Sequence, residues 1–124
     1  MAVVFILNDN VELQDYLRMR LVHEFEDMRV VATYDLAEAE EALLTMPEPD
    51  AIVWDANLPD GVSYDLIRKM RQRLKCPMIA ASSDERCRDE QLEAGCDVAC
   101  EPVSVHTILA GILAYKPEDS QDDC

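Results

Sequence analysis

The chain has 124 residues, the size of a single domain. Hydrophobic residues make up 49% and charged residues 30%, as in soluble globular proteins and unlike disordered chains. Its 26 acidic and 11 basic residues give a net charge of −15, which argues against direct binding to nucleic acid or to an anionic membrane surface. This charge suits a cation or a basic protein surface as a ligand.

The sequence shows no targeting or membrane segment. No apolar run approaches the roughly 20 residues of a membrane span, and no basic region precedes the first apolar segment. The odd number of cysteines, five, favours free thiols in a reducing cytoplasm. Because the two histidines show no zinc-ligand spacing with them, we expect the cysteines to act as small buried hydrophobic residues.

The apolar pattern predicts strands and helices in alternation. Short apolar runs predict strands at 2–7, 28–33, 50–54, 77–81 and 96–101. Apolar residues at helical spacing predict helices at 11–25, 35–46, 64–74, 84–94 and 104–115. We expect Asp35 and Ser104 to be N-caps and Gly95 a C-cap. Residues 1–115 then form one α/β domain, a parallel sheet covered on both faces, and residues 116–124 form an acidic flexible tail.

Polar residues follow several of the predicted strands. The residues in question are Asn8, Asp9, Asn10, Asp55, Asn57, Ser82, Ser83 and Glu101. In a parallel sheet the carboxyl ends of the strands share one edge, where ligands bind in open α/β sheets. We therefore expect these side chains to converge there.

This set of side chains has a chemical use. Carboxylate and carbonyl oxygens suit Mg²⁺, which would also relieve the repulsion between Asp9 and Asp55. A carboxylate beside such a metal is a nucleophile toward phosphorus, and the hydroxyl of Ser82 could bond a phosphoryl oxygen. The alternative is that Asp9 and Asp55 are only polar residues that end their strands.

The same residues resemble the receiver domain of two-component response regulators, and the resemblance extends to about Tyr115. The segment 50–61 is similar to the phosphoacceptor strand and its Leu-Pro-Asp-Gly turn. The resemblance implies a flavodoxin-like (βα)5 fold with strand order 2-1-3-4-5. It also implies that Asp55 is the phosphoacceptor and that Ser82 is the hydroxyl that bonds the phosphoryl group. Mg²⁺ would then bind Asp9, Asp55 and the backbone carbonyl of Asn57.

The sequence departs from that family at three places. Asn8 replaces the first acidic residue, and Glu101-Pro102 stands where the family has Lys-Pro. The segment 95–102 is one residue short and lacks the switch aromatic of the fifth strand. A glutamate that pointed inward would repel a phosphoryl group, whereas one that pointed to solvent would cost less. The resemblance also makes the Glu101–Pro102 bond a candidate cis peptide.

These features lead to three functional hypotheses. The first is a stand-alone, atypical receiver that takes a phosphoryl group from a histidine kinase or phosphotransfer protein. It would signal through contacts with a downstream protein, with a homodimer as a further arrangement, and would not be an enzyme beyond the phosphorylation and dephosphorylation of Asp55. The second is a pseudo-receiver, an interaction module independent of phosphorylation, which Glu101 favours. The third is a small phosphatase or other flavodoxin-like enzyme, for which the sequence offers no separate general acid.

Overall fold

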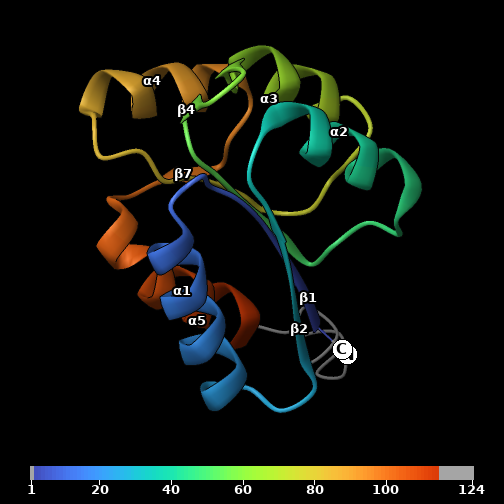
Figure 1. The fold of residues 1–124 in the computed structure, drawn as a ribbon, viewed down its shortest axis with the longest axis vertical. Helices are drawn as coiled ribbons and strands as arrows, with labels where there is room; N and C mark the ends of the chain where they lie inside the picture. The colour runs from blue at the N-terminus through green and yellow to red at the C-terminus, as the bar shows by residue number, and fades with distance from the viewer. Residues whose placement is uncertain (1, 115–124) are drawn as a thin grey trace, which may run out of the picture.

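The structure, a computed structural model, describes residues 2–114 and has a parallel five-stranded sheet at its centre (Figure 1). The strand order β2-β1-β3-β6-β7 is the flavodoxin-like order that the sequence predicts. The sheet consists of β1 (Ala2–Leu7), β2 (Met28–Thr33), β3 (Ala51–Trp54), β6 (Met78–Ala80) and β7 (Val98–Ala99). All four neighbouring pairs are parallel.

Helices cover both faces of the sheet (Figure 1). On one face, α1 (Val11–Glu24) and α5 (Val105–Ala114) pack against alternate residues of the strands, including Val4 and Val53. On the other face, α2 (Leu36–Thr45), α3 (Tyr64–Arg71) and α4 (Glu85–Ala94) pack against the remaining alternate residues, including Phe5 and Trp54. Burial of both faces explains why the central strands are continuous apolar runs.

Two predicted helix ends are confirmed. The Asp35 carboxylate accepts a hydrogen bond of 2.8 Å from the backbone N–H of Glu38 and so caps α2. Gly95 ends α4 at φ +138°, where a side chain would be strained. A Cβ at this position would also lie 3.0 Å from the Cβ and Cγ of Arg71, so the close approach of α3 requires glycine as well.

Three other segments differ from the prediction. The segment after β3 is a small antiparallel hairpin, β4 (Asn57–Leu58) with β5 (Gly61–Val62), and not only a turn. Helix α3 ends at Arg71, whose guanidinium then bonds the carbonyls of Leu74 and Cys76. Helix α5 follows a 3-10 turn, η1 (Pro102–Ser104), so Ser104 lies inside that turn.

The fifth strand is much shorter than the predicted 96–101. Its pairing with β6 covers only Val98 and Ala99, although the N–H of Cys100 still donates to the Ala80 carbonyl at 2.9 Å. Pro102 has no N–H with which to continue the ladder, and the Glu101 carbonyl instead accepts from Ser104 at 2.9 Å. The chain therefore turns away from the sheet as soon as it passes Cys100.

The cysteines within the described residues are free thiols. Cys76 and Cys96 are buried, as predicted, and burial raises the pKa of each to about 12. Cys87 and Cys100 are only half-buried. Cys124, the end of the predicted fifth helix at residue 115 and the predicted tail 116–124 lie outside the described residues.

Candidate functional site

Strand register brings the predicted site residues to one edge of the sheet. Leu7 pairs with Trp54, Trp54 with Ala80, and Ala80 with Ala99, so these four residues form one row across the sheet. Beyond this row by two positions lie Asp9, Ser82 and Glu101, and beyond it by one position lies Asp55.

The loop after β1 holds Asp9 between two anchored asparagines. Asn8 is buried, and its side-chain oxygen accepts from the N–H of Asn10 at 2.7 Å. The side-chain oxygen of Asn10 in turn caps α1 by accepting from Leu13 at 3.0 Å. Asp9 itself is exposed. The asparagine in place of the family's first acid is therefore a structural part of this loop.

Asp55 is half-buried directly after β3, in the middle of the sheet edge. Its N–H donates to the Leu7 carbonyl at 2.9 Å, and its carboxylate accepts from the N–H of Ala56 at 2.8 Å. Burial raises the pKa of Asp55, the bond from Ala56 partly offsets this, and the negative charge of Asp9 raises the pKa further. Asp9 and Asp55 thus lie close enough to repel each other.

The hairpin after Asp55 contains two more polar residues. Asn57 is exposed, and its side-chain nitrogen lies 3.8 Å from the sulfur of Cys87 at the start of α4. The carboxylate of Asp60 accepts from the N–H groups of Leu36 and Ala37 at 2.8 and 3.1 Å, and these bonds lower its pKa. Asp60 therefore links the hairpin to the start of α2, a role that the sequence did not reveal.

Ser82 is buried at the end of β6. Its hydroxyl oxygen accepts from the N–H of Asp84 at 3.1 Å, which leaves the hydroxyl hydrogen to be donated elsewhere. Its carbonyl accepts a 2.8 Å bond from the Arg88 guanidinium. Asp84 caps α4 by accepting from Arg86 and Cys87, so the whole segment is tied to the helix.

Glu101 is exposed at the far end of the site. The Glu101–Pro102 peptide is trans, as are all peptide bonds among residues 2–114, so the expectation of a cis bond is wrong. The trans form is the intrinsically favoured one, by about 0.5–1 kcal/mol for a bond before proline. Pro102 begins the 3-10 turn that leads into α5, and its place in that turn needs no cis bond.

Two buried glutamines, which the sequence pattern did not single out, support the site from below. On the α1 face, the Gln14 side-chain nitrogen donates to the carbonyls of Asn8 and Thr33, both at 3.0 Å. On the α4 face, the Gln91 nitrogen donates to the Trp54 carbonyl at 2.9 Å. The Thr33 carbonyl also accepts from the Asn8 N–H, and the Trp54 carbonyl also accepts from the Ala81 N–H, so each glutamine adds a second bond at a strand end. A polar residue inside an otherwise apolar helix stripe was the sequence signal that could have identified each glutamine.

The donor set fits a divalent cation with few protein ligands. Among the described residues, no three His, Cys, Asp or Glu side chains converge as a metal site. The edge offers the two carboxylates of Asp9 and Asp55, which raise each other's energy when both are ionised. Mg²⁺ commonly takes one or two carboxylates and completes its shell with water and other oxygens. These residues therefore fit Mg²⁺ and do not fit zinc.

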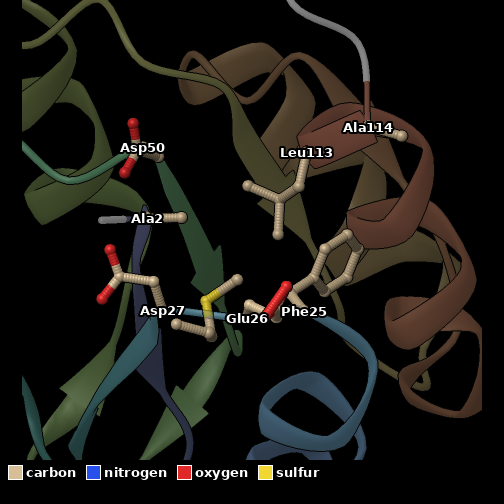
Figure 2. Close-up of a pocket in the computed structure, with 8 residues that line it drawn as sticks. Ala2, Phe25, Glu26, Asp27, Asp50, Leu113 and Ala114 are labelled. Atoms are coloured by element: carbon tan, nitrogen blue, oxygen red, sulfur yellow. The ribbon is translucent and has the colours of Figure 1, made fainter.

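A pocket lies at the other end of the sheet from this site (Figure 2). It has a volume of about 460 Å³ and lies beside the first residues of β1, β2 and the last residues of α5. Its lining comprises Ala2, Phe25, Glu26, Asp27, Met28, Asp50, Leu113 and Ala114. The Asp50 carboxylate there accepts from the N–H of Val3 at 2.7 Å, which is a structural role. None of the predicted site residues lines this pocket.

Comparison with known proteins supports the receiver resemblance, although no protein-family model matches the chain. The chain is 34% identical over 99 residues to the KDP operon transcriptional regulatory protein KdpE of Escherichia coli, covering 78% of this chain and 43% of that protein. It is 29% identical over 126 residues to the response regulator ArlR of Staphylococcus aureus, covering 99% of this chain and 56% of that protein. The chain thus spans about half the length of the curated relatives it matches.

Solved receiver structures share the fold. A two-component response regulator from Clostridium difficile superposes with a TM-score of 0.80 at 17% identity, covering 93% of this chain and 98% of that one. The Mn²⁺-bound form of the response regulator Rcp1 gives 0.76 at 17% identity, covering 93% and 94%. The chain therefore has the response-regulator receiver fold, and the resemblance noted in the sequence is confirmed. Separately, no helix within residues 2–114 is long and apolar enough to cross a membrane.

Proposed function

We propose that this receiver domain accepts a phosphoryl group on Asp55. The observation that carries the proposal is the half-buried Asp55 carboxylate at the centre of the sheet edge, with the charge of Asp9 beside it. Ser82, two residues after β6, has a hydroxyl hydrogen available for a phosphoryl oxygen. A carboxylate, a second acid and a hydroxyl donor at one edge of the sheet suit phosphoryl transfer to an aspartate.

The transfer step follows from this arrangement. A carboxylate oxygen of Asp55 attacks the phosphorus of a phosphohistidine and forms an acyl phosphate. The phosphorus–nitrogen bond breaks, and its electron pair stays with the imidazole. The Ser82 hydroxyl donates to one oxygen of the transferred group. Attack by water on the phosphorus then restores the carboxylate and releases phosphate, so the chemistry of the chain itself is limited to Asp55.

The metal belongs to the same proposal. Asp9, Asp55 and the backbone carbonyl of Asn57 would hold Mg²⁺, and the Mn²⁺-bound form of Rcp1, a protein of the same fold, supports a divalent cation here. When bound, the cation neutralises charge on the carboxylates and on the phosphoryl oxygens. The chain contributes the raised pKa of Asp55, which the repulsion from Asp9 partly causes and which a cation would reverse.

The donor in this account is a histidine kinase or a phosphotransfer protein, and the output is contact with a downstream protein. A net charge of −15 favours a basic surface on such a partner and disfavours direct contact of this domain with nucleic acid or an anionic membrane. Free thiols agree with a cytoplasmic location. A pair of identical chains is a further arrangement that we propose to test by light scattering with and without the phosphoryl donor.

A pseudo-receiver is the second candidate, and the end of β7 favours it. Glu101, an exposed anion, occupies the position of the family's cation, and β7 has only two paired residues. A domain of this kind would bind its partner without phosphorylation. The third hypothesis, a small hydrolytic enzyme, gains no support at the site, because the pocket in Figure 2 lies at the opposite end of the strands.

Intact mass separates the first two candidates. The protein is incubated with acetyl phosphate and Mg²⁺, beside Asp55→Asn and the control Asp65→Asn, which changes a fully exposed aspartate. We expect the wild type and the control to gain one phosphoryl group and Asp55→Asn to gain none. If the folded wild type gains nothing at saturating Mg²⁺, the pseudo-receiver is favoured, and if Asp55→Asn still gains the group, the site assignment is wrong.

A further inference from the structure

Arg88 is a half-buried basic residue of α4 that lies between the ends of β6 and β7. Its guanidinium donates to the carbonyl of Ser82 at 2.8 Å. Burial raises the pKa of the Cys100 thiol, and the positive charge of Arg88 partly offsets this effect, which places the guanidinium near Cys100 as well. Arg88 thus bonds the segment after β6, and its charge also acts on Cys100 after β7.

The contact with Ser82 fixes a residue that the site uses. Ser82 is held at two points, its hydroxyl oxygen by the Asp84 N–H and its carbonyl by Arg88. The Asp84 bond is local to the turn at the start of α4, whereas the Arg88 bond comes from the next turn of the helix. The hydroxyl hydrogen of Ser82 remains available, and its direction depends on how both bonds hold the backbone.

From this geometry we propose that Arg88 is the positioning residue of Ser82. Arg88 holds the serine so that its hydroxyl meets the phosphoryl group on Asp55, and it links that contact to α4. The inference rests on the proposed function, since it needs a phosphoryl group on Asp55. It assigns control of Ser82 to α4.

Precise placement of Ser82 has an energetic consequence. Interactions that stabilise a reacting group lose much of their effect when a donor is misplaced by a fraction of an ångström. A guanidinium–carbonyl bond is charge-assisted and therefore stronger than a neutral bond between the same kinds of atoms. Without it, Ser82 would keep only the bond to Asp84, and its hydroxyl would sample more directions around the acceptor.

The test is a double-mutant cycle on the rate of phosphoryl gain from acetyl phosphate. Arg88→Met removes the donor at similar length, and Ser82→Ala removes the hydroxyl. Arg86→Met is the matched control, because Arg86 is an exposed arginine on the same helix, two residues from Arg88. Thermal unfolding of each variant is recorded, so that a loss of fold is seen separately.

We expect Arg88→Met to slow phosphoryl gain by about threefold to tenfold, the effect of losing one such bond at the site, and Arg86→Met to leave the rate unchanged. In the Ser82→Ala background, Arg88→Met should have no further effect, because Arg88 acts through that hydroxyl. Arg88→Lys, which keeps the charge and a donor, should recover part of the rate.

Three results would overturn the inference. An unchanged rate in Arg88→Met would mean that Arg88 does not position Ser82. An equal slowing in both backgrounds would mean that its effect does not pass through the Ser82 hydroxyl. If the wild type gains no phosphoryl group at all, the proposed function fails and this inference fails with it, whereas the first two results leave phosphorylation of Asp55 intact.

Discussion

The ends of β3 and β7 lie on the same edge of the sheet but differ in how they are built. β3 is central and fully buried, and Asp55 follows it with both backbone and side chain hydrogen-bonded. β7 is an edge strand of two residues, after which the chain leaves the sheet and exposes Glu101. Asp55 is therefore held in place by hydrogen bonds, whereas Glu101 is exposed beyond the end of its strand.

This difference separates acceptance of a phosphoryl group from the response to it. The groups we assign to acceptance, Asp9, Asp55 and Ser82, lie on elements that many contacts fix. Apart from Asn8, the residues that depart from the receiver pattern lie on β7 and just beyond it. We therefore propose a working acceptor combined with an altered response, and four changes test this proposal.

The largest effect is expected at the acceptor end, from Asp9→Asn. This change removes one of two carboxylates that would hold Mg²⁺. We expect the rate of phosphoryl gain to fall by at least about a hundredfold, the upper end of the losses caused by removing a residue that only supports a metal ligand. The fluorescence of Trp54, the sole tryptophan, which is buried and adjacent to Asp55, should respond to Mg²⁺ in the wild type and much less in the variant. Equal phosphorylation of both proteins would remove Asp9 from the site.

At the β7 end, Gly95→Ala tests whether the entry to the short strand is fixed by the backbone. The positive φ of 138° and the 3.0 Å approach to Arg71 both oppose a side chain. We expect the free energy of unfolding to fall by about 1–3 kcal/mol, measured by urea denaturation. Gly111→Ala is the control, since a Cβ there meets nothing within 4 Å. A neutral Gly95→Ala would show that α4 and β7 tolerate displacement.

Glu101→Lys tests the response end directly. Two unit charges about 4 Å apart in water interact by about 1 kcal/mol, or roughly fivefold in a rate, and Glu101 is exposed enough for that dielectric. We expect Glu101→Gln, which only removes the repulsion, to lengthen the lifetime of the phosphoryl group by about fivefold. Glu101→Lys also adds an attraction, so we expect it to lengthen the lifetime by up to about thirtyfold. An unchanged lifetime in both variants would place residue 101 outside the reach of the phosphoryl group.

The smallest expected effect is on the pH dependence of the free energy of unfolding. Because the pKa of Asp55 is raised in the folded protein, its contribution to stability is fully present below the ordinary carboxyl pKa and is lost as the pH rises through the raised value. At pH 7 the ionised Asp55 therefore destabilises the fold. Asp55→Asn should be more stable than the wild type at pH 7 and equally stable in acid, as measured by urea unfolding. A variant less stable at pH 7 would contradict the stated cause of the shift.

Most of the fold was predictable because it depends on apolar pattern and on caps. The runs at 2–7 and 28–33 are strands at those residues. As expected, Asp35 caps the start of α2 and Gly95 caps the end of α4. The length of β7 was not predictable in the same way. Its ladder ends where Pro102 lacks an N–H and the chain turns into 3-10 geometry, and the apolar composition of 96–100 does not reveal that turn.

The placement of the candidate site residues at one edge of the sheet was predictable, whereas the hydrogen bonds that support them were not. Topology alone places Asp9, Asp55 and Ser82 on one edge, since they follow parallel strands. The bonds from Gln14, Gln91 and Arg88 to strand-end carbonyls depend on side-chain directions across 6 to 37 residues of sequence, which no local pattern encodes. The expectation of a cis Glu101–Pro102 bond was wrong, because it came from the family resemblance and not from the residues themselves.

Direct identification of the acceptor residue tests the central claim. After incubation with acetyl phosphate and Mg²⁺, borohydride reduces an acyl phosphate to an alcohol and so converts the modified aspartate to homoserine, which peptide mass mapping locates. The account predicts homoserine at position 55 alone, and none when Mg²⁺ is omitted. Homoserine at Asp9, Asp60 or any other aspartate, or at no position in the folded, Mg²⁺-saturated protein, would contradict it.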